Sequence, residues 1–459
     1  MQKFFSKYAL AAHLALLAVA PLFLFPFFDS SAVAEVLLWM SLLTVLWLVL
    51  EPSKRVGEYL RQAQGRVLRS CILDPLFGLF VLFFVIALIR CFNDGVQLVY
   101  DLFGDEWKWD ITPSRVSWLP GSVGRAGFIE LSTYVAVIVS VMACCHALGK
   151  SARIMFVFLS SLFAAIAAFI AIWVLKGDAK LVADTASYTA SSFSGSGFGV
   201  FSLASIVSLA GMFEQRWNKS LLLFAFAIGG AFTGLWFFAS SPIIGIYCIA
   251  GVLLILSSAI NVAIANGISA FFKFFVALII AAIIPVIILK FLMPIEVLEQ
   301  KLAFLTLNFF DFDYYASRLE YIEIAKNVWQ DGFMWQGGGL GCLPLYIQNS
   351  MAEKLWVKDI PCGWWQLIAE RGFIGLAMYI LPICFILFTF ILRLVKIRSL
   401  RAFWPMVILG LTVLVTVCIE GMFNAALLSP EVLVSTVAFL AVGVSSFSRR
   451  KVEGVENKE

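Results

Sequence analysis

The sequence predicts an all-α polytopic membrane protein with about twelve transmembrane helices. Hydrophobic residues make up 62% of its 459 residues and charged residues only 14%, a balance far from that of soluble proteins. The apolar residues are gathered in runs of about 17 to 25, the length that a helix needs to cross the hydrocarbon core. The runs lack the period-two alternation of barrel strands, so helices are the expected spans.

The expected spans follow one another along the whole chain. They are roughly residues 8–28, 33–51, 74–92, 129–148, 153–175, 197–213, 219–238, 241–259, 270–294, 373–393, 402–424 and 430–448. The first run follows a short basic start with Lys3 and Lys7 and resembles a signal peptide. Because no small-x-small cleavage site comes after it, we expect it to be retained as a span.

Basic residues mark alternate connections between these runs. They are Lys54, Arg55, Arg61, Arg66 and Arg69, then Lys150 and Arg153, then Arg216 and Lys219, then Arg393, Lys396, Arg398 and Arg401, and finally Arg449, Arg450 and Lys451. Short basic loops are retained in the cytoplasm. This pattern predicts that both termini are cytoplasmic and that the longer loops 93–128, 176–196 and 295–372 face outward.

The chain is therefore expected to divide into four parts. Residues 1–294 carry nine spans, 295–372 form a large outer loop, 373–449 carry three more spans, and 450–459 form a cytoplasmic tail. Within the large loop, residues 316–328 have helical character with Leu319, Ile322 and Ile324 on the apolar side. A glycine run follows, and the chain becomes helical again from Trp364.

Composition also limits the function. A net charge of +4 over this length gives little support to nucleic-acid binding. The nine cysteines and two histidines lack metal-ligand spacing, so a zinc or iron site is not expected. We expect no other cofactor. Cys342 and Cys362 both fall in the outer loop, where an oxidising compartment would allow them to form a disulfide.

The large loop holds the candidate chemistry. Arg318 carries a forked guanidinium suited to a phosphate or diphosphate, although an ion pair with a neighbouring glutamate is the simpler alternative. The backbone amides of Gly337, Gly339 and Gly341 are candidates to line an anion or sugar site, and an ordinary tight turn is their alternative. No nucleotide sugar is available outside the membrane, so a reaction there would need a donor delivered by the membrane.

Other polar and aromatic residues have two interpretations each. Asp311 and Asp313 form a DxD that could supply a general base rather than a metal site. Glu420 lies within the eleventh expected span, where an acid either serves a function or snorkels to the outer surface. Four tryptophans could stack on sugar rings or anchor the loop at the interface: Trp329, Trp335, Trp364 and Trp365.

Three sequence words together resemble the O-antigen ligase and O-antigen polymerase superfamily, bacterial membrane enzymes of polysaccharide assembly. The motifs are SRLEYIEIAKNVWQDGF, GGGLGCL and WWQLIAERGFIG, which lie within about sixty residues. Two weaker matches are EQRWNKSLLL and ASSPIIGI. About twelve spans with one large periplasmic loop between the ninth and tenth also fit that family.

The resemblance implies a metal-independent glycosyltransferase in the bacterial inner membrane. Its donor would be an undecaprenyl-diphosphate-linked glycan, and its acceptor another glycan, a lipid A core or a protein hydroxyl. Arg318 would hold the diphosphate, Glu370 matches the acid of the AExG word, and Glu420 resembles an acid of the eleventh span.

This chain departs from the family at three points, one of which is SSFSGSGFGVFS in place of an Asn-containing motif before the sixth span. Pro361 and Cys362 occupy the place of the usual catalytic histidine, and Pro242 that of a second arginine. In one interpretation the enzyme is active with a rearranged site, in which the base is one of Asp311, Asp313, Asp359 and Glu370 and the extra positive charge comes from one of Arg115, Arg125 and Arg371. In the other, the chain is a lipid-glycan binding, transport or accessory protein.

Overall fold

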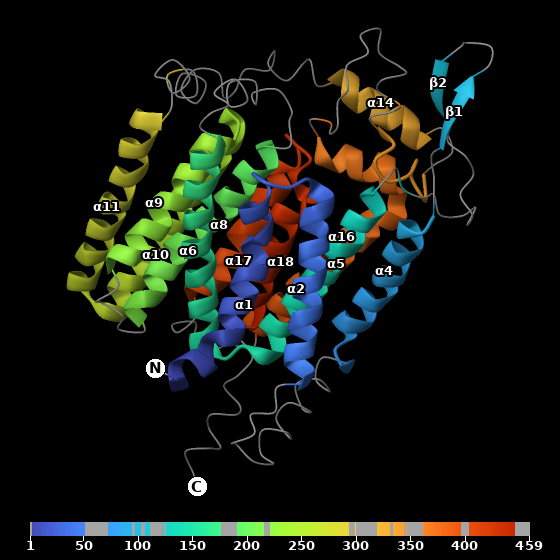
Figure 1. Cartoon of the computed structure of the whole chain (residues 1–459). Helices are drawn as coiled ribbons and strands as arrows, with labels where there is room; N and C mark the ends of the chain where they lie inside the picture. Colours follow the sequence, from blue (N-terminus) through green and yellow to red (C-terminus); the bar gives the residue numbers. More distant parts are fainter. Residues whose placement is uncertain are drawn as a thin grey trace.

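A computed structural model describes most of the chain. The described residues are 2–50, 72–93, 97–101, 106–110, 125–175, 191–214, 221–292, 319–330, 334–343, 362–395 and 404–445, with the single positions 122, 299, 346 and 360. Helices fill most of these ranges and run side by side as a bundle (Figure 1). The prediction of a polytopic helical membrane protein is confirmed at this level.

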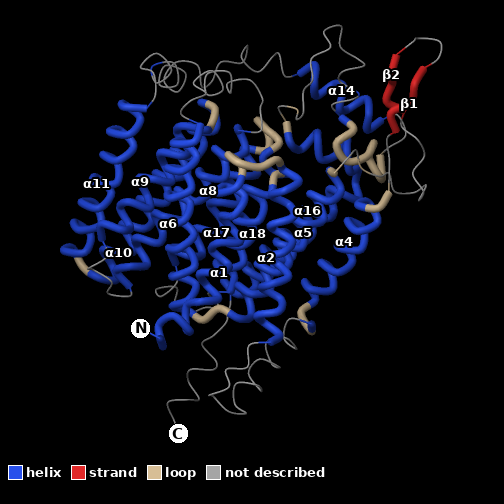
Figure 2. The backbone as a smooth tube through the Cα atoms, in the orientation of Figure 1, coloured by secondary structure: helices blue, strands red, loops and turns tan. Residues whose placement is uncertain are grey.

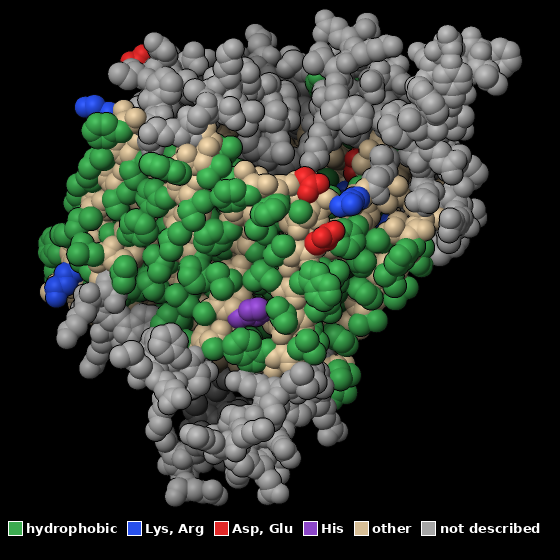
Figure 3. Space-filling model, viewed as in Figure 1, with side chains coloured by type: hydrophobic (Ala, Val, Ile, Leu, Met, Phe, Trp, Pro, Cys, Tyr) green, Lys and Arg blue, Asp and Glu red, His purple; other side chains and the backbone are tan. Residues whose placement is uncertain are grey.

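Each of the twelve apolar runs overlaps a described helix. The helices are α1 (Gln2–Leu24), α2 (Ser30–Leu50), α4 (Pro75–Cys91), α5 (Ala126–Met142) with the π-helical turn η1 (Ala143–Ala147), α6 (Lys150–Leu175), α8 (Ser191–Glu214), α9 (Leu221–Phe238), α10 (Ser241–Asn266), α11 (Ile268–Leu292), α16 (Gly363–Val395), α17 (Trp404–Glu420) and α18 (Pro430–Ser445). Eight of the described helices are long and apolar enough to cross a membrane, and four shorter apolar helices accompany them. Hydrophobic side chains cover the face of the bundle seen in Figure 3, as lipid contact requires.

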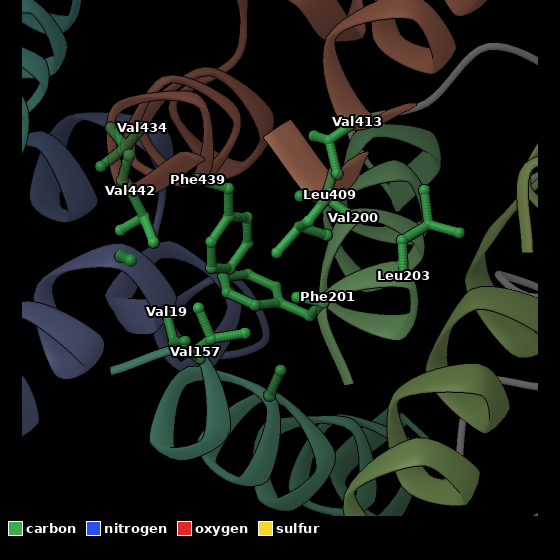
Figure 4. Close-up of a cluster of buried hydrophobic side chains, with 14 of the residues drawn as sticks. Val19, Val157, Val200, Phe201, Leu203, Leu409, Val413, Val434, Phe439 and Val442 are labelled. Atoms are coloured by element: carbon green, nitrogen blue, oxygen red, sulfur yellow. The ribbon is translucent and has the colours of Figure 1, made fainter. Parts of the chain in front are cut away.

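Helices α8 and α18 form the interior. The apolar part of α8, Ser194–Phe213, is wholly buried, whereas Ile268–Ile288 of α11 is only 22% buried. Phe201 of α8 packs edge-on against Phe439 of α18 at 5.7 Å, surrounded by valines and leucines from α1, α6 and α17 (Figure 4). Small residues of α8 permit close packing on its neighbours, since a Cβ at Gly197 would lie 3.2 Å from the carbonyl oxygen of Glu431 in α18, and one at Gly199 would lie 2.8 Å from the ring of Tyr247 in α10.

One end of the bundle gathers the residues of interest. The amphipathic helix α14 (Leu319–Gln330) lies at this end, together with the strands β1 (Gln97–Asp101) and β2 (Glu106–Asp110) (Figure 1). Ala325 and Val328 of α14 form a small separate core with Leu343, Ile360 and Ala369. The expected apolar side was wrong in one respect, because Leu319 is 65% exposed. We call this end the α14 end.

The two strands depart from the all-α prediction. They pair antiparallel from Gln97 with Asp110 to Asp101 with Glu106, and they are the only strands among the described ranges (Figure 2). They lie in the connection 93–128, outside the apolar runs. The physical reason is local, since QLVYD and EWKWD are short and rich in aromatic or β-branched residues.

Candidate functional site

The site at the α14 end is organised by a break in α16. Gly372 has φ +60° and ψ −162°, which divides α16 into the segments 363–371 and 373–395. A helix break leaves the carbonyls of one segment and the amides of the next without intrahelical partners. Such groups must be satisfied within the protein when they lie at membrane depth.

The segment before and within the glycine run satisfies them. Four backbone hydrogen bonds join the two parts of the chain: Gly338 donates to the carbonyl of Ala369 at 2.7 Å, Gly339 to Glu370 at 3.0 Å, Phe373 to Met334 at 3.0 Å and Ile374 to Trp335 at 3.0 Å. The guanidinium of Arg90, in α4, adds a side-chain hydrogen bond to the carbonyl of Arg371 at 3.2 Å. The hydrogen bonds from these segments therefore stabilise the break in α16.

Close approach explains why glycine occurs at this contact. Gly337 has φ +76°, and a Cβ there would lie 2.4 Å from the amide nitrogen of Arg371 and the carbonyl oxygen of Glu370. Because the amide of Gly339 already donates to a carbonyl, it is not free to bind an anion. Gly341, at φ +72°, is next to Leu340, which forms a β-bridge with Ser122 of the 93–128 loop. The glycine run 337–341 therefore forms a tight turn, which is the simpler of its two interpretations.

A buried charge cluster, consisting of Arg90, Glu130, Glu370 and Arg371, lies against the break. Arg371 Nε donates to Glu130 Oε1 at 2.7 Å, and its Nη1 lies 3.5 Å from Glu370 Oε2. Arg90 Nη1 lies 3.6 Å from the same Glu130 oxygen. The four side chains are at most 8% exposed and their formal charges cancel, which is the condition under which charges are tolerated inside a protein.

Further side chains hold the cluster in place. Gln366 Nε2 lies 3.4 Å from Glu370 Oε1, and the guanidinium of Arg371 lies 5.6 Å from the ring centre of Tyr379. Tyr134 donates to the carbonyl of Met378 at 3.4 Å, which ties α5 to α16. Glu130 Oε2 is buried and has no hydrogen-bond partner among the described residues.

The arrangement constrains the predicted roles of Glu370 and Arg371. Arg371, predicted to bind substrate, already contacts two carboxylates, so a phosphate would have to replace one of them. Glu370, predicted as a candidate base, is 4% exposed and faces a guanidinium. Both residues lie at the α14 end and could act there only after a change of partners.

Glu420 occupies a second buried site at the end of α17. Its Oε2 accepts from the Tyr247 hydroxyl at 2.8 Å, and its Oε1 accepts from Asn424 Nδ2 at 3.0 Å and from the Ser196 hydroxyl. The residue is 0% exposed. The snorkelling alternative is therefore wrong, and a substrate could contact this carboxyl only if the helices around it separated.

Trp364 anchors the start of α16 on α17. Its Nε1 donates to the carbonyl of Cys418 at 3.0 Å, and its amide lies 3.4 Å from the carbonyl of Gly421. The indole therefore docks the start of α16 on α17, and neither sugar stacking nor anchoring at the membrane interface is tested by this contact. Trp335 is 72% exposed and packs against Phe373 at 5.6 Å, so it presents an aromatic surface beside the break.

Several predicted residues lie elsewhere or outside the described ranges. Arg125 is largely exposed, donates to Ser31 Oγ at 2.9 Å and lies 3.9 Å from Glu35. The residues outside the description are Arg115, Asp311, Asp313, Arg318 and Asp359. Their roles remain predictions.

Cys342 and Cys362 are both buried and are not joined to each other, so the structure does not contain the disulfide that the sequence would allow. Burial raises the pKa of the Cys342 thiol well above its usual range. A thiol of this kind is a weak nucleophile, and its sulfur packs near Gly338 in the glycine run. These cysteines contribute to packing at the α14 end.

Sequence reasoning missed Arg90 and Glu130. Each stands alone near one end of an apolar run, in ALIRC and GFIEL. A charge inside such a run is costly, which is the signal that could have identified both. Their partner Arg371 could not have been assigned, because 241 residues separate it from Glu130.

Comparison with known proteins does not place this chain. No protein-family model, curated protein or solved structure matches it. Among the described residues, no group of three or more His, Cys, Asp and Glu side chains could hold a metal ion.

Proposed function

We propose that this protein is a membrane enzyme that transfers or polymerises glycan from an undecaprenyl-diphosphate-linked donor. One observation carries the proposal. Two of the words behind the resemblance, the glycine run and AERG, are about thirty residues apart in sequence and are joined directly by hydrogen bonds at the break in α16. A third word, which contains Arg318, continues into α14 at the same end of the bundle.

The proposed topology has twelve spans, cytoplasmic termini and a periplasmic loop. Contacts at the α14 end support alternating helix directions. The end of α4 meets the start of α5 through Arg90 and Glu130. The end of α17 meets the starts of α8 and α16, through Glu420 with Ser196 and through the hydrogen bond from Gly363 to Gly421. A polyprenol chain could then lie in the bilayer while its diphosphate head reaches the α14 end. We propose the bacterial inner membrane as the location.

The proposed reaction needs an anion site and a base. Arg318 would bind the diphosphate, and one of Asp311, Asp313, Asp359 and Glu370 would take the proton of the acceptor hydroxyl. The hydroxyl oxygen would bond to the anomeric carbon while the bond to the diphosphate breaks and the diphosphate leaves with its electrons. Arg371 would add positive charge once it exchanged Glu130 or Glu370 for a phosphate.

The second candidate function is binding or transport of the same lipid-linked glycan without transfer. The mutual pairing of Glu370 and Arg371 favours it, because neither group is available in this conformation. The lack of the family histidine at Pro361 and Cys362 points the same way.

Arg318→Ala separates the proposal from a purely structural role for this arginine. The wild-type protein and the variant are purified, reconstituted in vesicles with an undecaprenyl-diphosphate-linked oligosaccharide, and assayed for transferred or polymerised product. We expect the variant to lose product at least a hundredfold while its yield and oligomer profile stay normal, because the diphosphate has lost its charge partner. Lys326→Ala is the matched control, since it removes one exposed positive charge from α14.

Each outcome has a stated meaning. Equal product from Arg318→Ala and Lys326→Ala contradicts the role of Arg318. If wild-type protein binds the lipid-linked glycan but yields no product with any of the three acceptor classes, the binding or transport function replaces the enzymatic one.

A further inference from the structure

The carboxyl of Glu420 differs from the other two buried acids at the α14 end. Glu130 and Glu370 each face the guanidinium of Arg371. Glu420 is completely buried, and its three hydrogen-bond donors are the neutral groups of Ser196, Tyr247 and Asn424. No lysine, arginine or histidine lies within ion-pair distance of it among the described residues.

Among the described residues, the helices packed around α17 place no lysine, arginine or histidine within ion-pair distance of this carboxyl. α8 presents Ser196 and α10 presents Tyr247. The nearby titratable group of α18 is the acid Glu431, whose Cβ lies 3.4 Å from the position of a Cβ built at Gly197. On α16, the charged residues Glu370 and Arg371 belong to the buried charge cluster.

A carboxylate in such a place is unfavourable. Removing an isolated negative charge from water is far more costly than burying a neutral, hydrogen-bonded acid, and buried acids without a counter-charge take up a proton instead. Hydroxyl and amide donors orient the group but do not cancel its charge. When the carboxyl carries a proton, its O–H can donate to the hydroxyl oxygen of Ser196 or Tyr247, because a hydroxyl accepts as well as donates. We propose that Glu420 is a proton-binding site, occupied by a proton in the folded protein at neutral pH.

The location links this proton to the docking of α16. The carboxyl of Glu420 accepts from Asn424, and its backbone carbonyl accepts from the amides of Phe423 and Asn424 at 2.7 and 3.1 Å. The same turn holds the start of α16, because Gly363 donates to the carbonyls of Gly421 and Asn424 at 2.8 and 3.0 Å. Loss of the proton would place a negative charge at this joint and favour its opening. This inference does not depend on the proposed glycan transfer.

A carbodiimide identifies protonated carboxyls in an apolar environment. The acid adds across one C=N bond of dicyclohexylcarbodiimide, and the O-acylisourea formed rearranges to a stable N-acylurea that peptide mass spectrometry detects. With the full-length protein in membranes at pH 7, we expect an adduct at Glu420 and at least tenfold less at Glu130 and Glu370, whose arginine partners keep them ionised. Equal labelling of all three acids, or labelling that spares Glu420, overturns the proposal.

A second measurement does not depend on access of the reagent. Glu420→Gln keeps the shape of the protonated acid and removes its titration. A carboxyl in the unfolded chain is ionised above about pH 4.3, so unfolding the wild-type protein releases the proton, and its unfolding equilibrium constant should rise relative to Glu420→Gln by up to tenfold for each pH unit between 5 and 8. Unfolding in mixed micelles of increasing dodecyl sulfate fraction provides this constant. Parallel pH dependence of the two proteins refutes the proton site.

Discussion

Removal of the Arg371 guanidinium tests the buried charge cluster. Arg371→Met keeps an apolar stem of similar length but deletes the contacts to Glu130 at 2.7 Å and to Glu370 at 3.5 Å. Two carboxylates that are 1% and 4% exposed would then share one guanidinium, that of Arg90, which lies 3.6 Å from Glu130. Breaking a buried pair by removing one partner costs about 3 to 5 kcal/mol, and we expect the free energy of unfolding to fall by this amount.

The second half of this test is a double-mutant cycle. Glu130→Gln removes the charge that Arg371→Met leaves behind, so the double variant should be more stable than the sum of the two single losses by about 2 to 3 kcal/mol. Equilibrium unfolding in mixed micelles measures all four proteins. Arg125→Met is the control, because its pair with Glu35 is 69% and 57% exposed and should contribute about 0.2 to 1 kcal/mol. A loss no larger than that of the control, with no coupling to Glu130, would show that the cluster does not hold α16.

Two more predictions concern the glycine run. Gly337→Ala should prevent the four backbone hydrogen bonds at the break, because the new Cβ would lie 2.4 Å from backbone atoms and φ is +76°. We expect the yield of folded protein in membranes to fall greatly. Gly78→Ala is the control, since its Cβ meets nothing within 4 Å, and equal yields of the two variants would contradict the close approach at Gly337. Because the pKa of the Cys342 thiol is raised, maleimide labelling of Cys342 at pH 7 should be at least tenfold slower in the folded protein than after unfolding. The labelling rate of the folded protein should increase as the pH rises towards that pKa. Labelling that requires prior reduction would instead indicate a disulfide with Cys362.

The sequence alone determined the helical membrane architecture. A backbone in lipid must satisfy its own hydrogen bonds, so an apolar run of about 20 residues has helix as its stable local structure. This is why each expected run overlaps a described helix, from α1 to α18. The requirement for hydrogen bonding in lipid does not apply to polar loops, so it could not predict the pairing of β1 with β2.

Tertiary structure decided what the charged and glycine residues do. The sequence is compatible with an ordinary turn at Gly337. In the folded protein the backbone of Arg371 lies so close to Gly337 that a Cβ would not fit there. Arg90, Glu130 and Arg371 belong to three different helices, and only the packing of those helices brings their charges within ion-pair distance. Such pairings depend on how helices lie against one another, because local propensity fixes each helix but not its neighbours.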